Sequence, residues 1–435
     1  MIYGMESPWR CTASTAISRR FGRCLAISAS TRSVKHQRSA GMGNVLKIDK
    51  IEDLHCDAGW RTFSFLKVTT DDGLIGWSEY TEGDGSRGLT SIIHGMAEAL
   101  IGMDPRPVQA ISSLLYIRHQ QAANGVNQRA MAAIENALLD IKGKALGVPV
   151  YELFGGPVRT RFPVYWSHCG TYRVRNHLDI GMPRALSYDD IVALGAQVKA
   201  RGFKGLKTNI LDFDGEKLVG FGPGAGRTPG WPELNVDRKT LKSVRDTLAA
   251  FRAGAGPDMD LYLDVNYHFK TEGLLKVARA VEPYNLTWLE FDTWDPQALA
   301  LIRNHAPCPV ASSESVTGRR AYRPFLDAYA SDVVIIDVLW NGFLESIKVA
   351  SMAEAYEVNV APHNYYGHLA TAISAHFCAV TPNFRVMEVD IDSVSWRDEL
   401  FLNAPVIENG DLLLPGGPGW GVEVNEAAVR ARPPK

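Results

Sequence analysis

Six ionisable residues recur along the second half of the chain at nearly constant spacing. They lie 26, 24, 23, 26 and 25 residues apart, in the order Asp264, Glu290, Glu314, Asp337, His363 and Glu388. Each ends a short apolar run that precedes a loop and a helix-like stretch. About 25 residues is the length of one β-strand plus one α-helix, so the series predicts successive βα units of a barrel. Because the carboxyl ends of barrel strands converge on one mouth, the six groups predict a site of chemistry there.

The first three members of the series are carboxylates on consecutive predicted strands. Brought together at the mouth, Asp264, Glu290 and Glu314 repel one another unless a cation lies among them. Oxygen ligands without Cys or His favour a hard ion, namely Mg²⁺. Any one of these acids could instead be a solvated strand-end charge or a helix N-cap, but three at one period favour a metal site. Asn266, on the same face as Asp264, is expected to support it.

The next two predicted strands carry Asp337 and His363. An acid beside a histidine fixes the tautomer of the imidazole and stabilises its charged form, which makes a general base that works near neutral pH. A lone histidine in a barrel is usually structural, but the neighbouring acid and metal site favour catalysis. Lys207, on the predicted strand 205–209, could neutralise an oxyanion beside the metal. Because side chains alternate along a strand, Asn209 is expected to share the inward face of Lys207.

These groups need a barrel and a covering domain to hold them. Residues 44–160 are typical of an α+β domain and contain a β-hairpin pattern at 63–77. Three helical patterns follow, at 89–101, 108–119 and 128–146. We expect a modified barrel of the α/β class over 161–395. The tail, 396–435, has no room for a further βα unit, and we expect it to return to the capping domain.

The first 43 residues differ in composition from the rest. Their first 40 hold six arginines and one lysine against a single acid, Glu6, with many Ser and Ala residues. That composition resembles an organellar targeting segment. No apolar periodicity supports an amphipathic helix, however, so an upstream start codon is favoured, with the fold beginning near Met42 or Val45. Either way, residues 1–43 are expected to lie outside the fold.

The overall composition narrows the class of protein. Forty-six basic residues against 48 acidic ones give no basic field for nucleic acid or a membrane surface. No apolar run approaches the roughly 20 residues that a membrane span needs. Six scattered cysteines contain no CxxC pair, which favours a reducing compartment. We therefore expect a cytoplasmic protein that acts on a small molecule.

Several motifs resemble the mandelate racemase/muconate lactonizing enzyme family of the enolase superfamily, over about residues 46–430. The motifs are Lys207-Thr208-Asn209, Leu263-Asp264-Val265-Asn266, Leu289-Glu290, Ser313-Glu314, Asp332 to Asp337, Pro362-His363-Asn364, Met387-Glu388, Asp140 to Gly147 and Leu414 to Val422. The resemblance implies an α+β capping domain, completed by the tail, on a (β/α)₇β barrel. It also implies Mg²⁺ on Asp264, Glu290 and Glu314, removal of the proton next to a substrate carboxylate, and a symmetric homo-oligomer.

One position departs from the pattern of the family's racemases. They carry a second lysine where this chain has Asn209, and asparagine cannot accept a proton. A 1,1-proton transfer needs a base on each face of the substrate, whereas β-elimination can proceed with one. Lys-x-Asn is similar to acid-sugar dehydratases of the galactonate type, although those carry a histidine at the position of Asn266.

We therefore expect a Mg²⁺-dependent dehydratase that converts an aldonate or aldarate into a 2-keto-3-deoxy acid. The alternative is a racemase, epimerase or cycloisomerase on a similar carboxylate, and a third possibility is a barrel that serves only as a partner surface. In the first reading His363 is the base, and Asp337, Lys207 and Glu388 assist it. The general acid is left open among His363 itself, Tyr365, His268, His168 and His368.

Three substrate-binding residues and one covering segment complete the expected site. Asn209, Asn266 and Arg61 are the expected substrate-binding residues, and Arg61 could meet a distal carboxylate or be an ordinary surface arginine. The run 220–227 is rich in glycine but lacks the Lys-Ser/Thr ending of a phosphate loop, and Pro223 removes a backbone donor. We expect this run to be an insertion over or beside the mouth.

Overall fold

The computed structural model describes residues 46–83, 85–213, 219–221 and 235–435. The described residues belong to one compact unit, Val45–Lys435. The expectations for residues 1–43 and for most of the run 220–227 concern residues outside the described part. All contacts below belong to the unit Val45–Lys435.

The N-terminal part of this unit is an antiparallel sheet with helices. The sheet has the order β1-β2-β3, with bounds Ile48–Asp57, Thr62–Thr70 and Ile75–Tyr80. Its helices are α1 (Leu89–Ala97), α2 (Val108–His119) and α3 (Val126–Leu146), with short 3₁₀ turns at Glu98–Leu100, Gln120–Ala122 and Val150–Phe154. Gly73, with a φ of +88°, closes the β2–β3 hairpin, as its Asp-Asp-Gly turn predicts. The predicted hairpin and the three helices are confirmed, and we call this part the cap.

The strands that follow form a parallel barrel. Within the described residues its strands are β4 (Arg161–Trp166), β5 (Gly205–Thr208), β8 (Asp260–Asp264), β9 (Trp288–Glu290), β10 (Val310–Ser312), β11 (Val333–Asp337), β12 (Asn359–His363) and β13 (Met387–Val389). Neighbours pair in parallel from β4 through β5 and β8 to β12, and β13 pairs with the other side of β4. A bridge between Val360 and Phe384 connects β12 to the segment that enters β13.

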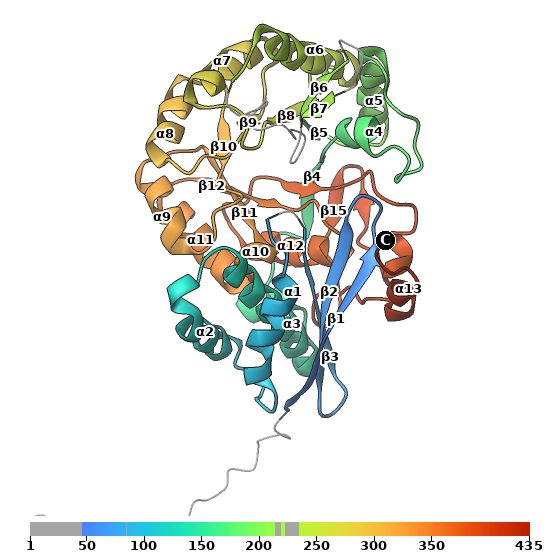
Figure 1. Cartoon of the computed structure of the whole chain (residues 1–435), viewed down its shortest axis with the longest axis vertical. Coiled ribbons are helices and arrows are strands. Elements are labelled where there is room, and N and C mark those ends of the chain that lie inside the picture. The colour runs from blue at the N-terminus through green and yellow to red at the C-terminus, as the bar shows by residue number, and fades with distance from the viewer. Residues whose placement is uncertain (1–45, 84, 214–218, 222–234) are drawn as a thin grey trace, which may run out of the picture. The chain divides into compact units, whose positions relative to one another are not determined.

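Seven main helices surround this barrel in the described part of the chain (Figure 1). They are α5 (Tyr188–Ala200), α6 (Arg238–Ala255), α7 (Thr271–Val281), α8 (Pro296–His305), α9 (Arg319–Asp327), α11 (Phe343–Ala355) and α12 (His368–Val380). Shorter elements are α4 (Thr171–Arg175), α10 (Val338–Asn341), the hairpin β6 (Ile210–Asp212) and β7 (Val219–Phe221), and 3₁₀ turns at Glu282–Tyr284 and Asp398–Leu400. One main helix after each strand but the last gives (β/α)₇β, so the expected modified barrel is confirmed.

The interior of the barrel is filled by its own aromatic layer. The rings of Tyr165 and Tyr262 lie 4.8 Å apart, and those of Tyr262 and Trp288 lie 4.3 Å apart. These side chains are buried together with small and branched residues of the later strands. A larger apolar core fills the space between strands and helices. The barrel is therefore packed rather than hollow, and polar groups at the strand ends rest on this layer.

The tail returns to the cap, as expected. A hairpin of β14 (Ile407–Glu408) and β15 (Asp411–Leu413) pairs with β4. Asn409 and Gly410 between its strands have φ of +50° and +78°, the geometry of a tight hairpin turn. Helix α13 (Glu426–Arg430) lies against β1, and Lys67 of β2 pairs with Glu426 at 2.7 Å.

Three buried carboxylates of the cap join it to the barrel and tail. Glu79 accepts hydrogen bonds from the backbone N–H groups of Gly367 and Ala370 at the start of α12, at 2.7 and 3.0 Å. Glu135 of α3 accepts one from the N–H of Leu344, at 2.8 Å, near the start of α11. Asp140 accepts the N–H groups of Trp77 and Trp420, at 2.8 and 2.9 Å. The first two therefore sit where a helix N-terminus favours negative charge.

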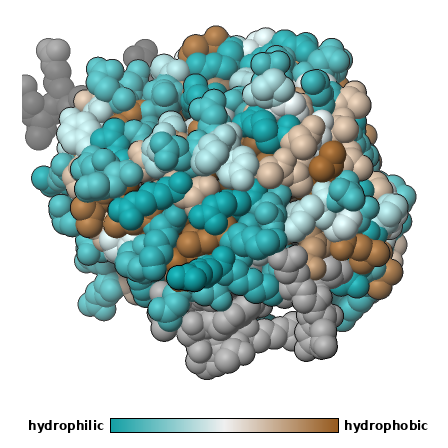
Figure 2. Space-filling view, turned by 90° about the horizontal axis from the view of Figure 1, so that it is seen from above, coloured by the Kyte–Doolittle hydropathy of each residue, from teal (hydrophilic) through white to brown (hydrophobic). Residues whose placement is uncertain are grey.

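No helix among the described residues is long and apolar enough to cross a membrane. On the face in Figure 2, hydrophobic residues are scattered singly or in small groups among hydrophilic ones. Such scattering is normal for a folded protein surface.

Candidate active site

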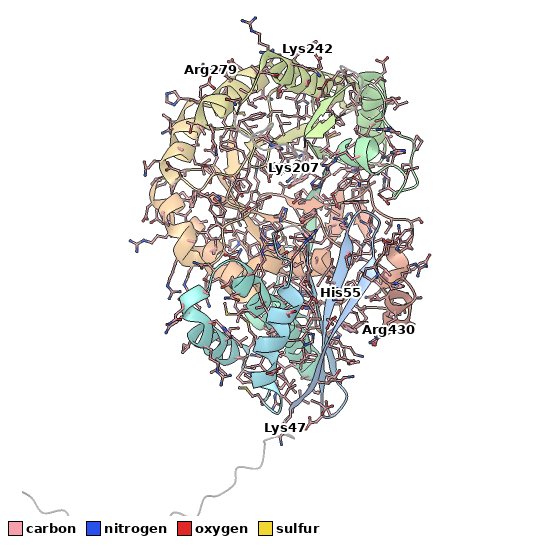
Figure 3. All side chains as sticks on the ribbon, in the orientation of Figure 1. Lys47, His55, Lys207, Lys242, Arg279 and Arg430 are labelled. Carbon is pink, nitrogen blue, oxygen red and sulfur yellow. The ribbon has the colours of Figure 1, made fainter. Side chains whose placement is uncertain are left out.

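Lys207 lies at the barrel mouth among carboxylates from three other strands. Its side chain, on β5, is 3% exposed. Its Nζ lies 2.9 Å from Glu388 Oε1, 3.0 Å from Glu290 Oε1 and 3.7 Å from Asp264 Oδ2. Figure 3 places Lys207 inside the ring of barrel helices, whereas Arg279 of α7 lies at its outer edge. The parallel strands thus bring together four of the sequence-predicted site residues.

The carboxylates of β8 and β9 accept hydrogen bonds from residues close to them in sequence. Asp264 accepts the backbone N–H of Asn266 at 2.8 Å and its side-chain Nδ2 at 3.2 Å. Asn266 has a φ of +50°, which turns its backbone back toward Asp264. Its Oδ1 is buried and has no hydrogen-bond partner in the described structure, so this oxygen is available to a bound molecule. Glu290 Oε2 accepts the indole N–H of Trp288 at 2.9 Å.

Glu388 of β13 has the most complete set of partners. Its Oε1 faces Lys207 and accepts the hydroxyl of Ser167 at 2.5 Å. Its Oε2 accepts the backbone N–H of Asn364 at 2.8 Å. Burial alone would raise the pKa of Glu388, but the positive charges of Lys207 and His363 bring it down to about 2. Glu388 is therefore a fixed negative charge beneath the mouth.

Glu314 lies just beyond β10, on a loop that another acid holds in place. Asp292 accepts the backbone N–H groups of Ser313 and Ser315, at 2.7 and 3.0 Å. Ser313 has a φ of +86°, and these two hydrogen bonds hold that uncommon conformation. Sequence reasoning missed Asp292. Its signal was its position two residues after Glu290, where a strand would repeat the same face.

His363 and Asp337 form a buried pair across β11 and β12. The two are direct partners in the parallel register, and His363 Nδ1 lies 2.7 Å from Asp337 Oδ2. Asp337 also accepts the backbone N–H of Trp340 at 2.8 Å and the phenol O–H of Tyr366. The other ring nitrogen of His363, Nε2, lies 3.4 Å from Glu314 Oε2. Tyr366 was missed by sequence reasoning, and no sequence signal pointed to it.

The protonation of the mouth follows from its burial and its charges. Burial raises the pKa of Glu290 to about 7 against the pull of Lys207. Burial likewise raises the pKa of Glu314 well above its usual range, with His363 opposing and nearby acids reinforcing the shift. Burial would lower the pKa of His363, but Glu314 and Asp337 raise it to about 10. Strongly shifted pKa values in neighbouring groups are typical of a site of acid–base chemistry.

The oxygen-rich side of the mouth fits a hard divalent cation by its donor chemistry. No group of three His, Cys, Asp or Glu side chains within the described residues is arranged as a finished metal site. Asp264 and Glu290 are nevertheless neighbours in register, and both contribute negative charge at Glu314. These three acids offer only oxygen ligands, which Mg²⁺ prefers. Lys207 supplies a positive charge among the first two of them.

The side chain of Asn209 has a protein partner at both its nitrogen and its oxygen. Its Nδ2 donates to the backbone carbonyl of Asp264 at 3.0 Å, and its Oδ1 accepts the hydroxyl of Thr171 at 2.9 Å. Strand β5 ends at Thr208, so the alternation of faces does not extend to Asn209. The structure thus brings Asn209 next to the mouth but gives its amide protein partners.

Arg61 reaches from the cap to the far wall of the mouth. Its Nη2 lies 2.9 Å from Asp390 Oδ2, and its Nη1 donates to the backbone carbonyl of Tyr365. Its guanidinium also lies over the rings of Trp60 and Tyr365, at 4.9 and 5.6 Å. Arg61 is therefore neither a loose surface residue nor an unpaired charge. Asp390, two residues after Glu388, is a further polar group that sequence reasoning missed.

The four candidates for a separate general acid lie in different surroundings. Tyr365 packs on His363 with ring centroids 4.9 Å apart. His168 Nδ1 lies 3.2 Å from Asp390, and its ring lies 5.9 Å from that of Tyr365. His368 lies 2.7 Å from Asp398, and burial lowers its pKa to about 4. His268 is buried in the loop after β8. Of these four described side chains, Tyr365 is the one whose ring packs against His363.

Family models match both parts of the chain. The model described as "Mandelate racemase / muconate lactonizing enzyme, N-terminal domain" matches residues 58–155. The model described as "Enolase C-terminal domain-like" matches residues 190–428, which is more than half of the chain.

Curated relatives cover most of the chain. A D-galactonate dehydratase family member from Streptomyces bingchenggensis is 31% identical over 86% of this chain and 90% of its own length. A D-galactonate dehydratase from Ralstonia nicotianae is 29% identical over 89% of this chain and 94% of its own length. A D-gluconate dehydratase from Thermoproteus tenax is 27% identical over 92% of this chain and 77% of its own length.

Among solved structures, a protein from Burkholderia xenovorans strain LB400 is 46% identical, with a TM-score of 0.87. The match covers 89% of this chain and 98% of that one, and the protein is provisionally assigned as an L-alanine-DL-glutamate epimerase. A second structure of the same protein contains magnesium and fumarate. A provisionally assigned dehydratase from Mesorhizobium loti is 26% identical, with a TM-score of 0.77 and coverage of 89% and 98%.

Proposed function

The chain belongs to the mandelate racemase/muconate lactonizing enzyme family of the enolase superfamily, and from this premise we propose that it is a Mg²⁺-dependent sugar-acid dehydratase. The substrate would be an aldonate or aldarate, and the product its 2-keto-3-deoxy acid. The names of the curated relatives, D-galactonate and D-gluconate dehydratase, support this substrate class. The observation that carries the proposal is the His363–Asp337 pair facing a lysine–carboxylate cluster, with asparagine at the position of a second base.

In this proposal His363 removes the proton from the carbon next to the substrate carboxylate. Asp337 holds the imidazole by its Nδ1, which leaves Nε2 as the nitrogen that takes the proton. Lys207 and Glu388 are the electrostatic groups beside the enediolate that forms. Asp264, Glu290 and Glu314 would hold Mg²⁺, which would stabilise negative charge on the substrate carboxylate.

The proton affinity of His363 depends on whether Glu314 is neutralised. Glu314 is the main group that raises the pKa of His363, because its Oε2 lies 3.4 Å from the imidazole Nε2. A cation held by Glu314 would offset this attraction and would lower the pKa of His363 toward the range that a general base needs. In this proposal the charge of Glu314 would thus connect metal binding to the protonation of the base.

Elimination also needs a proton for the departing 3-hydroxyl. The C–H bond at the α-carbon and the C–O bond at C3 break, water leaves, and the resulting enol becomes the 2-keto acid. His363 can return the proton it took, in a syn elimination. Tyr365 is the second source, since its ring packs directly on His363.

The second candidate function is epimerisation, which the provisional assignment of the 46% identical Burkholderia protein favours. Epimerisation at the α-carbon needs a proton donor on the face opposite His363. In this chain that position holds Asn209, whose amide is already bound to Thr171 and to the Asp264 carbonyl. The presence of asparagine at this position supports elimination over epimerisation.

A substrate panel with two readouts tests the proposal. Aldonates and aldarates are incubated with the full-length protein and Mg²⁺, and 2-keto products are detected by reaction with semicarbazide. In parallel, exchange of the α-proton is followed by NMR in D₂O. Keto-acid formation that stops on chelation and returns with Mg²⁺ is expected. Exchange or inversion without any keto product would replace dehydration by epimerisation, and full turnover after chelation would remove the metal from the proposal.

A further inference from the structure

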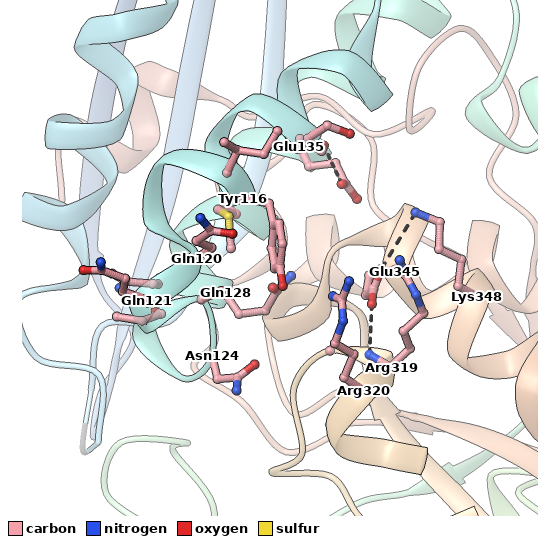
Figure 4. A pocket seen from close by; sticks show the side chains of 18 of the residues that line it. Tyr116, Gln120, Gln121, Asn124, Gln128, Glu135, Arg319, Arg320, Glu345 and Lys348 are labelled. Atoms are coloured by element: carbon pink, nitrogen blue, oxygen red, sulfur yellow. Dashed lines mark hydrogen bonds and ion pairs between the residues drawn. The ribbon is translucent and has the colours of Figure 1, made fainter. Parts of the chain in front are cut away.

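A pocket separate from the barrel mouth lies between the cap and the barrel helices (Figure 4). It is enclosed by α2 and α3 on one side and by the starts of α9 and α11 on the other. Its volume of about 600 Å³ falls within the range of small-molecule sites in proteins. None of the mouth residues described above lines it.

Positive charge is in excess on the barrel side of this pocket. Arg319 pairs with Glu345, and Lys348 lies 3.8 Å from the same carboxylate. Arg320, next to Arg319, has its guanidinium over the ring of Tyr116 at 5.1 Å. In the described part of the chain no carboxylate lies within ion-pair distance of Arg320. Three cations therefore line this side of the pocket with one half-buried acid, Glu345, and Arg320 is the cation that can bind an anion without giving up an ion pair.

The cap side of the pocket is rich in neutral hydrogen-bonding groups. The side chains that line it there include Gln109, Ser113, Gln120, Gln121, Asn124 and Gln128. Amides and hydroxyls can each donate and accept, which suits the hydroxyl groups of a polyol. Gln109 Oε1 accepts a hydrogen bond from Lys348 at 3.1 Å, so the neutral and cationic sides meet across the pocket.

Glu135 of α3 also lines the pocket, but it does not compete with an anion in the way an exposed acid would. The residue is 7% exposed, and its carboxylate already accepts the hydroxyl of Ser112 at 2.7 Å and the N–H of Leu344 at 2.8 Å. Burial raises the pKa of Glu135 to about 7, so part of its negative charge is neutralised near neutral pH. The pocket is thus cationic at its barrel side and weakly charged at Glu135.

We propose that this pocket is a second binding site, for a small anion that carries hydroxyl groups. The anionic group would lie on Arg320 and Lys348, and the hydroxyls on the amides of α2 and α3. The same chemistry is found in a free hydroxy-carboxylate and in a phosphate-bearing ligand. Binding here needs no turnover at the mouth, so the inference stands or falls independently of the proposed function.

The pocket is also connected by hydrogen bonds to α10, the short helix that follows Asp337. Gln128 Nε2 donates to the backbone carbonyl of Asn341, the last residue of α10, at 2.7 Å. Asn341 Nδ2 donates in turn to the carbonyl of Asp337 at 3.0 Å. A ligand that contacts Gln128 would therefore be connected to α10 through a single hydrogen bond. Slower hydrogen exchange in α10 is then expected when the ligand binds.

The test uses calorimetric titration of the full-length protein, with and without Mg²⁺. D-gluconate and inorganic phosphate are the two probes, one for each source of anion. The double variant Arg320→Gln/Lys348→Gln removes two cations of the pocket. Arg323→Gln is the matched control, because Arg323 lies on the same helix, is 73% exposed and pairs with Asp327 outside the pocket. Hydrogen exchange of the wild type, with and without the probe, locates the bound molecule.

We expect saturable binding of at least one probe that does not require Mg²⁺. The double variant should bind it at least tenfold more weakly, whereas Arg323→Gln should stay within twofold of the wild type. Slower exchange should appear in residues 109–128 and in α10. Gluconate binding identifies a carboxylate as the anionic group, and phosphate binding alone identifies a phosphate. Absence of binding by both probes, equal binding by the double variant, or protection confined to the barrel mouth would overturn the proposal.

Discussion

The barrel mouth and the cap–barrel interface both bury carboxylates, but they satisfy them differently. At the mouth, Lys207 lies among Asp264, Glu290 and Glu388, so the acids are balanced by a side-chain charge. At the interface, Glu79 and Glu135 accept backbone N–H groups at the starts of barrel helices. Side-chain charges can move and exchange protons, whereas backbone groups are fixed.

The proton affinities of the two regions reflect this difference. Burial raises the pKa values of Glu79 and Glu135 to about 7 each, and the backbone donors only partly oppose it. At the mouth the same burial leads to opposite results, about 7 for Glu290 and about 2 for Glu388. Divergent values are typical of groups that divide acid and base roles. The mouth is therefore expected to govern activity, and the interface stability.

The largest effect is expected from His363→Asn at the mouth. Loss of the base should lower kcat by about a thousandfold, within the range for removal of a general base. The asparagine amide can still donate to Asp337, so the free energy of unfolding should change by less than about 1 kcal/mol. The two measurements are the turnover of the sugar acid that the substrate panel identifies and unfolding in urea. A variant that keeps more than a tenth of its activity would remove His363 from the reaction.

Asp140→Asn tests the interface side of the comparison. The new amide donor would face the N–H groups of Trp77 and Trp420 and leave Lys144 with one acid fewer. Breaking a buried pair of this kind should cost about 3 kcal/mol of unfolding free energy. The activity of the folded protein should remain.

The matched control for Asp140→Asn is Asp246→Asn. Asp246 pairs with Lys242 at 2.5 Å on the exposed side of α6, where such a pair contributes less than about 1 kcal/mol. Urea unfolding of both variants gives the contrast. Equal losses of stability at the two positions would contradict a special role for the interface acid.

The third prediction concerns how stability depends on pH through Glu135. Its pKa is about 7 in the folded protein and about 4.5 when exposed, so the folded state holds a proton that the unfolded state releases. This contribution is fully present below pH 4.5 and is lost as pH rises through 7. Between pH 5 and 8 the wild type should therefore lose about 2 kcal/mol more than Glu135→Gln. Glu354→Gln, an exposed change on α11, should follow the wild type, and parallel pH profiles for all three proteins would refute the assignment.

The smallest effect is expected from Tyr366→Phe, which removes one of three donors to Asp337. Because the other two remain, kcat should fall by about threefold to tenfold, the equivalent of about 1 kcal/mol. Tyr356→Phe is the control, since Tyr356 donates to Asp327 at the exposed surface. A thousandfold loss in Tyr366→Phe would instead place this phenol in the chemistry.

Strand ends could be predicted from the sequence because each catalytic candidate is tied to a local pattern. An apolar run indicates each strand, and the period of about 25 residues indicates which strand comes next to it. The pairing of Asp337 with His363 could therefore be predicted from the sequence alone. Tyr366 and Arg61 could not be placed in the same way. Their partners lie 29 and 329 residues away, across a loop and across two parts of the chain. Such contacts depend on loop conformation and cap docking rather than on periodicity.

Asp292 and Asp390 could be predicted from the sequence only in part. Each comes two residues after a strand-end acid, and so does Asn266 after Asp264. This spacing of two residues could be seen in the sequence, but the partners of these side chains could not be predicted from it. A residue past the end of a strand no longer follows strand geometry. Asn209 shows the same limit, since it lies one residue past β5 and turns its amide to Thr171 and the Asp264 carbonyl.

The contact of Asp140 with Trp420 has a consequence for how the protein is made. The two residues are 280 positions apart, and Trp420 is fully buried against the cap. On a ribosome the cap is therefore synthesised long before the segment around Trp420 that completes its packing. Until that segment emerges, Asp140 lacks one backbone donor and the apolar surface beside it is uncovered. Emergence of Trp420, rather than completion of the cap's own sequence, is therefore needed before the cap acquires its full stability.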